Sequence, residues 1–333
     1  MAALRARLIA WFERRWYGGV APGPLLRALS ALFGRIARSR REAGLSGRKP
    51  GERSGVPVLV VGNLAVGGAG KTPLTVALVE ALRARGFRPG VISRGYGRRG
   101  SEARRVRAED SPAEAGDEPL LIARRTGAPV AVAARRSEAA RLLVETGEVD
   151  LLLADDGLQH YALARDLEIL VIDGRRRFGN GRLLPAGPLR EPVERATACD
   201  FTVVNGGTPE AGEIPMRLAL SEAVPLGGGP SRPLAEFSVL RVHAVAGIAD
   251  PERFFSALRG AGLDPIPHPF PDHHPFTAAD LDFEDGLPVL MTEKDAVKCA
   301  GIAPAHAWMV PATAELPETF FDAVAARLRE LAP

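Results

Sequence analysis

The stretch VPVLVVGNLAVGGAGKTP, residues 56–73, decides the fold. An apolar, β-branched run over residues 56–61 breaks into a glycine-rich turn and then into a helical pattern. This order of strand, turn and helix is the context in which a Gly-rich loop ending in Lys-Thr binds phosphate. The stretch therefore predicts a nucleotide-binding loop of the Walker A type.

The residue types in this loop suit phosphate binding. Glycines lack a Cβ, so successive backbone N–H groups can turn inward around phosphate oxygens at the start of the next helix. We expect Lys71 to reach the β- and γ-phosphates and the Thr72 hydroxyl to bind Mg²⁺. The predicted nucleotide-binding residues are Gly67, Gly68, Ala69, Gly70, Lys71, Thr72 and Pro73.

The alternative is a Gly-rich hairpin or linker between a strand and a helix. The strict pattern opens with glycine, and Ala65 stands there instead, which is acceptable if its φ is negative. Only four lysines occur among the 43 basic residues, so arginine is used wherever a surface charge suffices. A lysine kept in this loop therefore indicates a need for its compact ammonium, which favours the phosphate loop.

Downstream of the loop, apolar runs alternate with helical patterns, which is typical of a parallel α/β sheet. Strands that are apolar throughout are buried on both faces, so we expect a doubly wound, mostly parallel P-loop sheet. The further strands predicted for it span residues 91–93, 130–133, 149–154, 168–172 and 201–204.

A domain boundary is expected within residues 205–235, where glycine and proline dominate and periodicity fades. The prediction divides the chain into basic amphipathic helices (1–50), a P-loop core (51–210) and a smaller α/β domain (211–333). In the last of these we expect strands at 238–247 and 288–292 and helices at 250–258 and 317–331.

Basic charge is concentrated at the N-terminus. Residues 1–53 hold twelve Arg or Lys against three Glu, a net +9, so the rest of this +3 chain carries −6. Such helices favour an anionic membrane surface, and packing on the first domain is the equal alternative. No nucleic-acid-binding module is recognisable and no obligate protein partner is evident. The apolar stripes comprise Leu4, Leu8, Trp11 and Phe12, then Leu25, Leu29, Leu32, Phe33 and Ile36.

The remaining composition narrows the class of protein. Cys199 and Cys299 form no disulfide framework and no metal-ligand spacing, which indicates a reducing compartment. We expect neither a secretory signal nor a membrane span, since no run reaches about 18 apolar residues.

Acidic residues follow the strand at 149–154. Its apolar run leads directly into Asp155 and Asp156. Adjacent carboxylates at the end of a buried strand are unfavourable without a cation, so a Mg²⁺ site is favoured over a simple turn.

Two further candidates have alternatives. Asp117 opens an apolar helix, where its spacing favours an N-cap over a general base for an acceptor hydroxyl. His273 and His274 stand in a Pro-flanked loop that lacks the further ligands of a metal site. One of them closing on the nucleotide is as good an interpretation as a solvated loop.

In their order along the chain, these motifs resemble the tetraacyldisaccharide 4′-kinase family, the lipid A 4′-kinases. The resemblance covers nearly the whole chain, including its basic start. It rests on GNL at 62–64 with the loop that follows, SRGYG at 93–97, DDGLQH at 155–160, GNGRLLPAGPLRE at 179–191, DHH at 272–274 and TEKD at 292–295.

The resemblance implies that ATP, with Mg²⁺, phosphorylates the 4′-hydroxyl of an acylated glucosamine disaccharide 1-phosphate at the cytoplasmic face of the bacterial inner membrane. It implies a general base at Asp117 supported by His273, although His274 fits the local pattern too. Asp155 and Asp156 would serve Mg²⁺. The polar positions attributed to the active site match Arg136, Gln159, His160 and Arg190.

Two other functions compete with this one. The first is a membrane-associated regulatory or transport P-loop NTPase, and the second is a soluble small-molecule kinase whose N-terminal helices pack on its core. Residues 292–295 superficially resemble a guanine-specificity motif, but Lys294 and Asp295 are adjacent instead of separated by one residue. This spacing disfavours GTP.

Overall fold

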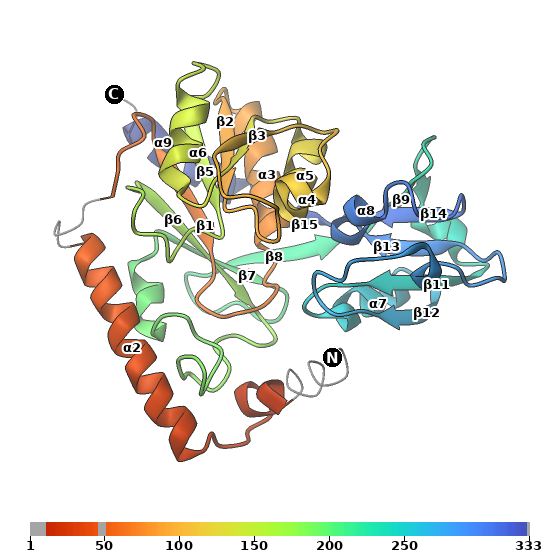
Figure 1. Ribbon diagram of the computed structural model, residues 1–333, viewed down its shortest axis with the longest axis horizontal. Helices are drawn as coiled ribbons and strands as arrows, with labels where there is room; N and C mark the ends of the chain where they lie inside the picture. The colour runs from red at the N-terminus through yellow and green to blue at the C-terminus, as the bar shows by residue number, and fades with distance from the viewer. Residues whose placement is uncertain (1–10, 46–50, 332–333) are drawn as a thin grey trace.

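The computed structural model describes residues 11–45 and 51–331, most of which build two sheets (Figure 1). The strands of the larger sheet are β1 (Val58–Gly62), β2 (Pro89–Ser93), β3 (Arg104–Val106), β4 (Val130–Val132), β5 (Leu151–Asp155), β6 (Leu167–Asp173), β7 (Phe201–Asn205), β8 (Ile214–Ala219) and β15 (Thr313–Glu315). Their order is β15-β8-β7-β6-β1-β5-β2-β4-β3. Only the edge strands β3 and β15 pair antiparallel. The expected strands of this sheet are all present, with ends within two residues of the prediction.

Helices cover both faces of the larger sheet. On one face lie α3 (Lys71–Ala84), α5 (Asp117–Thr126) and α9 (Glu318–Leu331), and on the other lie α6 (Arg136–Val144) and the 3-10 helix η1 (Val193–Ala198). A short helix, α4 (Pro112–Ala115), precedes α5. Alternate residues of β1 serve the two cores: Leu59 and Val61 face α3, and Val58 and Val60 face α6. The predicted doubly wound α/β sheet is confirmed.

The second sheet is smaller and also mostly parallel. Its order is β10-β9-β14-β13-β11-β12, with antiparallel pairing only at β9 and β10. Helices α7 (Pro251–Gly260) and α8 (Glu293–Cys299) cover its opposite faces. Its strands are β9 (Glu222–Pro225), β10 (Arg232–Pro233), β11 (Arg241–Ala246), β12 (Asp264–Pro269), β13 (Val289–Thr292) and β14 (Ala307–Val310), and two 3-10 turns, η2 (Leu234–Phe237) and η3 (Ala278–Asp280), lie between them.

The sequence pattern predicts a domain boundary at residue 211, but the division between the two sheets does not fall there. β8 joins the larger sheet, and after the second sheet the chain returns to it through β15 and α9. Phe320 of α9 packs edge-on against Phe201 of β7, with ring centroids 5.7 Å apart. The second sheet is thus an insertion between β8 and β15. Sequence patterns miss this because these strands are short or half-exposed and lack an apolar run.

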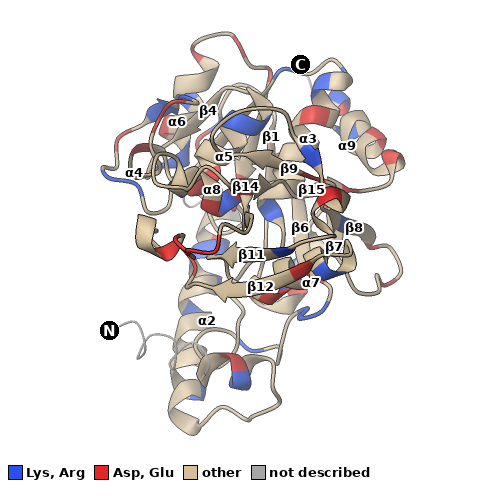
Figure 2. Ribbon diagram, turned by 90° about the vertical axis from the view of Figure 1, so that its right-hand side faces the viewer, with Lys and Arg blue, Asp and Glu red and all other residues tan. Residues whose placement is uncertain are grey.

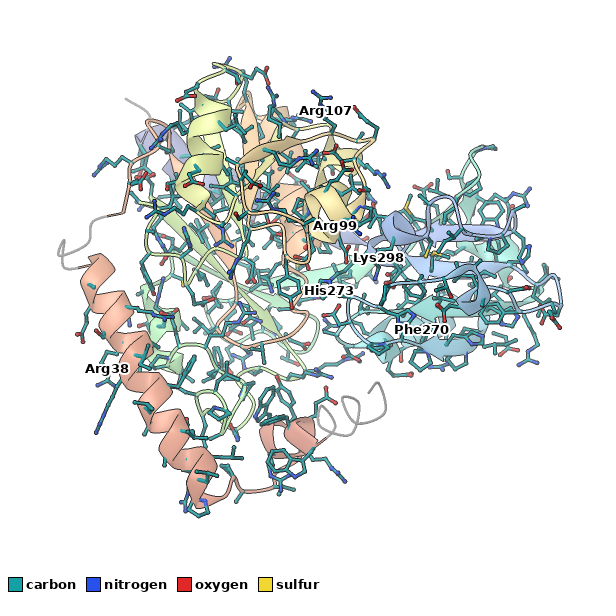
Figure 3. All side chains as sticks on the ribbon, viewed as in Figure 1. Arg38, Arg99, Arg107, Phe270, His273 and Lys298 are labelled. Atoms are coloured by element: carbon teal, nitrogen blue, oxygen red, sulfur yellow. The ribbon has the colours of Figure 1, made fainter. Side chains whose placement is uncertain are left out.

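Helix α2 (Pro24–Leu45) lies along the side of the larger sheet away from the second sheet (Figure 1). It carries five arginines and a single glutamate, and Figure 3 labels one of these arginines, Arg38. The basic colouring of α2 is visible in Figure 2. The helix contacts the body through small residues: Ser30 Oγ donates to the Leu183 carbonyl at 2.8 Å, and a Cβ at Gly34 would lie 2.8 Å from Leu183 Cδ1.

The apolar stripe of α2 faces away from the body. Leu25, Leu29, Leu32 and Ile36 are 72%, 45%, 55% and 46% exposed. We call these four residues the α2 ridge. Packing on the first domain does not account for apolar side chains at these exposed positions. The predicted Leu4 and Leu8 lie outside the described residues. Among the residues that are described, no helix combines the length and apolarity needed to cross a bilayer.

Candidate active site

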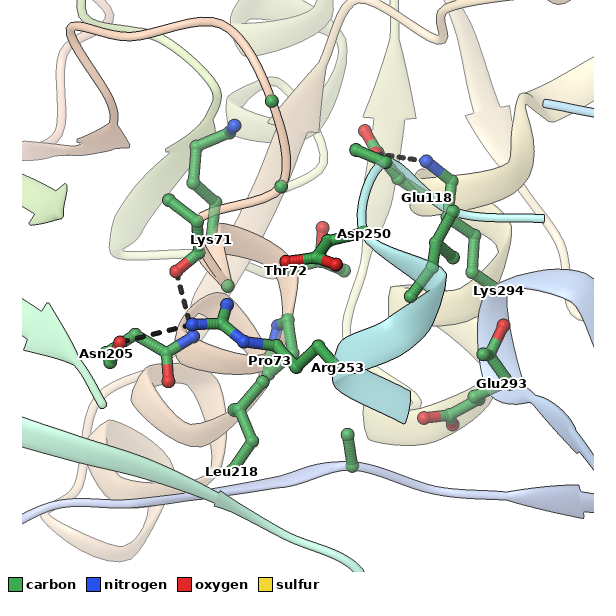
Figure 4. A pocket seen from close by; sticks show the side chains of 18 of the residues that line it. Lys71, Thr72, Pro73, Glu118, Asn205, Leu218, Asp250, Arg253, Glu293 and Lys294 are labelled. Atoms are coloured by element: carbon green, nitrogen blue, oxygen red, sulfur yellow. Dashed lines mark hydrogen bonds and ion pairs between the residues drawn. The ribbon is translucent and has the colours of Figure 1, made fainter. Parts of the chain in front are cut away.

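A cavity of about 1000 Å³ lies between the two sheets, beside the carboxyl ends of β1, β5 and β7 (Figure 4). Every predicted nucleotide-binding residue from Gly67 to Pro73 lines it. Of the other predicted residues, Arg136, Asp156, Gln159, His160, Arg190 and His273 line it too. Asp155 and Asp117 are buried, only 1% and 9% exposed. The structure thus brings the separate sequence motifs together around one space.

The phosphate loop depends on glycine at two places. Gly67 has φ 116° and Gly70, the N-cap of α3, has φ 93°, a region that L residues rarely adopt. A Cβ at residue 70 would also collide with the Asn205 side chain. The loop therefore opens directly onto the N-terminal end of α3, where unpaired N–H groups attract phosphate.

Asn205, at the tip of β7, supports the phosphate loop and was missed from sequence. Its Nδ2 donates to the Ala69 carbonyl at 3.0 Å, and the residue is only 2% exposed. A signal was present, because a polar residue directly follows the apolar run at 201–204 at the carboxyl edge of the sheet.

The pKa values of the two adjacent aspartates are shifted in opposite directions. Asp155 is fully buried in the sheet, and its Oδ1 accepts a hydrogen bond from Thr75 Oγ1 at 3.1 Å. Burial, together with the charges of Glu118 and Asp156, raises the pKa of Asp155 to about 7. A carboxylate in this position gains most from a nearby cation.

Asp156, by contrast, already has cationic partners. Lys71 Nζ lies 3.5 Å from its Oδ1 and Arg190 Nη1 lies 3.2 Å from its Oδ2. Burial alone would raise the pKa of Asp156, but Lys71 and Arg190 outweigh it and hold the pKa at about 2. Asp156 has a positive φ of 48°, which is uncommon for a residue other than glycine.

The residues beside the phosphate loop fit Mg²⁺. Thr72 stands on the first turn of α3, and Thr75, at the start of the second turn, contacts Asp155 directly. Within residues 11–45 and 51–331, no group of three or more His, Cys, Asp or Glu side chains forms a complete metal cage. Mg²⁺ that binds with a nucleotide needs none, because one or two carboxylates, phosphate oxygens and waters complete its coordination.

Arg136 and Gln159 fix the end of β5. The Arg136 side chain, 7% exposed, donates from Nη2 to the carbonyls of Asp155 and Asp156 at 3.2 and 2.7 Å. Gln159 Nε2 donates to the Asn63 carbonyl at 3.0 Å, which ties the segment after β5 to the segment after β1. Both side chains therefore hold the aspartates and the phosphate loop in one arrangement.

His160 is neutral at neutral pH and its ring is available to a ligand. Burial lowers its pKa, and the charges of Arg136 and Arg165 lower it further, to about 4. In the part of the chain that the structure describes, its buried Nε2 has no hydrogen-bond partner. Because buried polar atoms are normally paired, this atom is a candidate contact for a bound molecule.

Asp117 contacts His273 at the edge of the cavity, which His273 lines. Helix α5 begins at Asp117, but its N-cap is Gly116, so the N-cap interpretation of Asp117 is wrong. Instead, Asp117 Oδ2 lies 3.0 Å from His273 Nδ1. His273 stands at the junction of the two units in Figure 3, with φ 60°.

The neighbouring histidine makes a different pair. His274 Nε2 lies 3.2 Å from Asp280 Oδ2, a residue of the same unit. The choice left open by the sequence is therefore made by geometry: His273 contacts Asp117 and His274 does not.

Other contacts between the two units were not predicted. Lys294 Nζ of α8 lies 3.1 Å from Glu118 Oε1 and 3.3 Å from Asp272 Oδ1, as the close-up shows for Glu118 (Figure 4). These two carboxylates raise the pKa of Lys294 even though burial opposes them. Arg253 of α7 donates to the Asn205 carbonyl at 3.3 Å. Lys294 belongs to the TEKD motif, but its partners could not be predicted, because only the packing of distant segments brings these residues to the cavity.

Comparison with known proteins gives one consistent result. Residues 23–329 match the model of a family described as tetraacyldisaccharide-1-P 4′-kinase. The chain is 50% identical over 328 residues to the tetraacyldisaccharide 4′-kinase of Stenotrophomonas maltophilia, with 96% of each chain covered. It is 52% identical over 331 residues to that of Xanthomonas oryzae, with 95% of each covered. It also resembles the crystal structure of LpxK from Aquifex aeolicus in complex with ATP, with a TM-score of 0.77 and 27% identity over 92% of this chain and 98% of that one.

Proposed function

The chain belongs to the tetraacyldisaccharide 4′-kinase family, and from this premise we propose how its residues transfer the ATP γ-phosphoryl group to the 4′-hydroxyl of tetraacyldisaccharide 1-phosphate. It is an ATP-dependent kinase of lipid A biosynthesis. The family match does not favour the regulatory or transport NTPase. The observation that carries the catalytic proposal is the contact between Asp117 and His273, because His273 lines the same cavity as the phosphate loop.

ATP binding uses the phosphate loop and an exchange of ion pairs. The loop amides and the start of α3 hold the phosphates, and Lys71 leaves its 3.5 Å contact with Asp156 to reach the β- and γ-phosphates. Thr72, Asp155 and Asp156 would hold Mg²⁺, which would supply charge neutralisation at the phosphate oxygens. Arg190 keeps Asp156 paired while the lysine is away.

Phosphoryl transfer then depends on Asp117. The acceptor 4′-oxygen forms a bond to the γ-phosphorus as the bond from that phosphorus to the β,γ-bridging oxygen breaks, and ADP leaves. The hydroxyl proton passes to the Asp117 carboxylate, and His273, 3.0 Å away, orients that carboxylate. This is in-line transfer by positioning and charge stabilisation, with little covalent chemistry for the protein to perform.

The acceptor occupies the side of the cavity formed by the segment after β5. We assign its polar contacts to Arg136, Gln159, His160 and Arg190. The unpartnered Nε2 of His160 supports this assignment, because a sugar hydroxyl would satisfy it.

Two features support membrane association: the acyl chains of the acceptor and the exposed apolar and basic residues of α2. Each buried CH₂ of an acyl chain contributes about 0.8 kcal/mol, so a tetraacylated acceptor stays in the bilayer and the enzyme comes to it. The exposed α2 ridge and the arginines of α2 support binding to an anionic membrane surface. We infer a peripheral position at the cytoplasmic face of the inner membrane, where ATP is available.

The test is transfer of labelled γ-phosphate from ATP to tetraacyldisaccharide 1-phosphate in nonionic detergent micelles. Wild type is expected to label the lipid, and Lys71→Ala to lower the rate about 10²- to 10³-fold, as removal of one charge-stabilising donor does. Release of phosphate to water without labelled lipid would remove the acceptor assignment. In that case the NTPase alternative would explain the cavity better.

A further inference from the structure

A second, smaller cavity lies outside the active site. It is a groove of about 480 Å³ between α2 and residues 181–183. Small residues, among them Ser30 and Gly34, let the loop approach the helix closely and form the floor. Four arginines line it, and we call this site the arginine groove: Arg27, Arg35, Arg38 and Arg182.

Among the described residues, the four arginines have no anionic partner. All four are exposed, and none forms an ion pair with the residues that the structure describes, in contrast to arginines elsewhere such as Arg177, which lies 2.7 Å from Glu213. Four like charges around one groove repel each other, and an anion bound between them removes that repulsion. The planar guanidinium binds phosphate oxygens in pairs, which makes phosphate the anion best suited to the groove.

The position of the groove indicates where that phosphate comes from. Arg27, Arg35 and Arg38 lie on the same helix as the α2 ridge but on other sides of it, and Arg182 lies in the adjoining loop. When the ridge enters the acyl region of a bilayer, the opposite side of the helix, which carries Arg27 and Arg38, stands ~10 Å higher, at the level of the headgroups. A phosphate attached to a lipid would therefore reach the groove without leaving the membrane.

The groove is also connected to the active site through one loop. The Arg182 carbonyl accepts a hydrogen bond from the Leu189 amide at 3.1 Å, and the next residue, Arg190, contacts Asp156 at 3.2 Å. Residues 182–190 thus have the arginine groove on one side and the phosphate end of the main cavity on the other. A lipid phosphate held in the groove would lie beside the acceptor site.

We propose that the arginine groove binds a lipid-borne phosphate at the membrane surface. Two lipids present this chemistry: the acceptor itself, through its 1-phosphate, and an anionic phospholipid of the surrounding bilayer. The inference rests on the proposed kinase reaction and membrane association and adds a binding site to them. The groove would thereby position the enzyme on the membrane and hold residues 182–190 next to a lipid headgroup.

The test compares two triple variants of equal charge. Arg35→Gln/Arg38→Gln/Arg182→Gln removes three arginines of the groove, and Arg14→Gln/Arg40→Gln/Arg53→Gln removes three exposed arginines outside it. One assay measures sedimentation with vesicles of phosphatidylglycerol and phosphatidylcholine. The other measures the KM for the acceptor in nonionic micelles, with and without its 1-phosphate. Circular dichroism and thermal melting check that both variants fold.

Each of the two lipid sources gives its own result. If phospholipid occupies the groove, the groove variant binds phosphatidylglycerol vesicles at least tenfold more weakly than the control variant, since each arginine contributes about fivefold. The micellar KM then stays at the wild-type value. If the acceptor occupies it, the KM rises about tenfold or more for the 1-phosphorylated acceptor and is unchanged for the acceptor that lacks this phosphate.

Equal losses in the two triple variants in both assays would overturn the proposal, because the arginines would then act only through diffuse charge. Failure of the proposed kinase function looks different. Wild type would then label no lipid, while the vesicle assay would still report on the groove.

Discussion

The phosphate end of the main cavity and the arginine groove are both rich in cations, but they are organised differently. At the phosphate end, Asp156 is paired with Lys71 at 3.5 Å and Arg190 at 3.2 Å before any nucleotide is bound. In the arginine groove, four arginines line one space and no carboxylate of the described chain pairs with them.

The difference shows two ways of preparing for phosphate. Where internal partners exist, a ligand exchanges with them, so the charges stay in place and the geometry is fixed in advance. Where they are absent, the ligand itself supplies the missing charge, so occupancy depends on what the membrane offers. The first arrangement suits catalysis and the second suits recognition of a surface.

The largest expected effect is on kcat, from a substitution at the main cavity, whose charges are already paired. Asp117→Asn keeps the shape of the side chain but cannot take the hydroxyl proton, so kcat should fall about 10²- to 10⁴-fold, as for loss of a general base. The measurement is labelled lipid formed per unit time at saturating ATP. Asp280→Asn is the matched control, because it alters the neighbouring His–Asp pair, His274–Asp280, outside the cavity. Equal rates in the two variants would contradict a catalytic role for Asp117.

The next largest effect is expected on membrane binding through the α2 ridge, which lies on the same helix as most of the arginine groove. Leu25→Ser/Leu32→Ser should weaken vesicle binding about thirtyfold, taking about 1 kcal/mol for each partly buried leucine, and leave kcat in micelles unchanged. Val239→Ser/Leu240→Ser is the control, since these residues are 85% and 48% exposed but lie on the second unit. If both pairs bind vesicles equally, the α2 ridge does not enter the bilayer.

A smaller effect tests how rigidly the phosphate end is built. Asn205→Ala leaves the Ala69 carbonyl without its side-chain partner, which should lower the free energy of unfolding by about 1–3 kcal/mol. It should also raise the KM for ATP more than that for the acceptor. Urea unfolding and initial rates measure the two quantities. An unchanged KM for ATP would mean that the loop does not depend on β7 for its shape.

The smallest effect depends on pH. The pKa of His160 is lowered from 6.5 to about 4, so between these values the unfolded chain binds more protons than the folded one. Stability from this group is therefore complete above pH 6.5 and falls as the pH drops towards 4, by at most about 1.4 kcal/mol per pH unit. His160→Gln should flatten the stability of the protein between pH 6.5 and 5 relative to wild type. Parallel curves for the two proteins in urea would contradict a buried neutral histidine.

Much of the larger sheet and its phosphate loop could be predicted from sequence. The strands β1, β5 and β6 are buried along their whole length and so read as continuous apolar runs, and the loop carries glycines where φ is positive. These signals are local, and local sequence is enough to predict them.

The rest depends on contacts between distant segments. β15 is an edge strand and β8 is its neighbour, and both have mixed exposure, so no apolar pattern marks them. The contact between Asp117 and His273 joins residues 156 positions apart, and spacing alone favoured a cap at Asp117. The composition of α2 was predictable, but which side of it would face the body depended on small residues meeting Leu183.

The return of α9 to the larger sheet has a consequence for synthesis. On the ribosome the nucleotide-binding unit starts to emerge first, yet β15 and α9 leave the exit tunnel only after the whole inserted sheet. Until then, the face of the sheet that Phe320, Phe321 and Leu328 will cover remains open. The second unit can fold while the first waits, so a translational stall before residue 313 would leave an unfinished, aggregation-prone nascent chain.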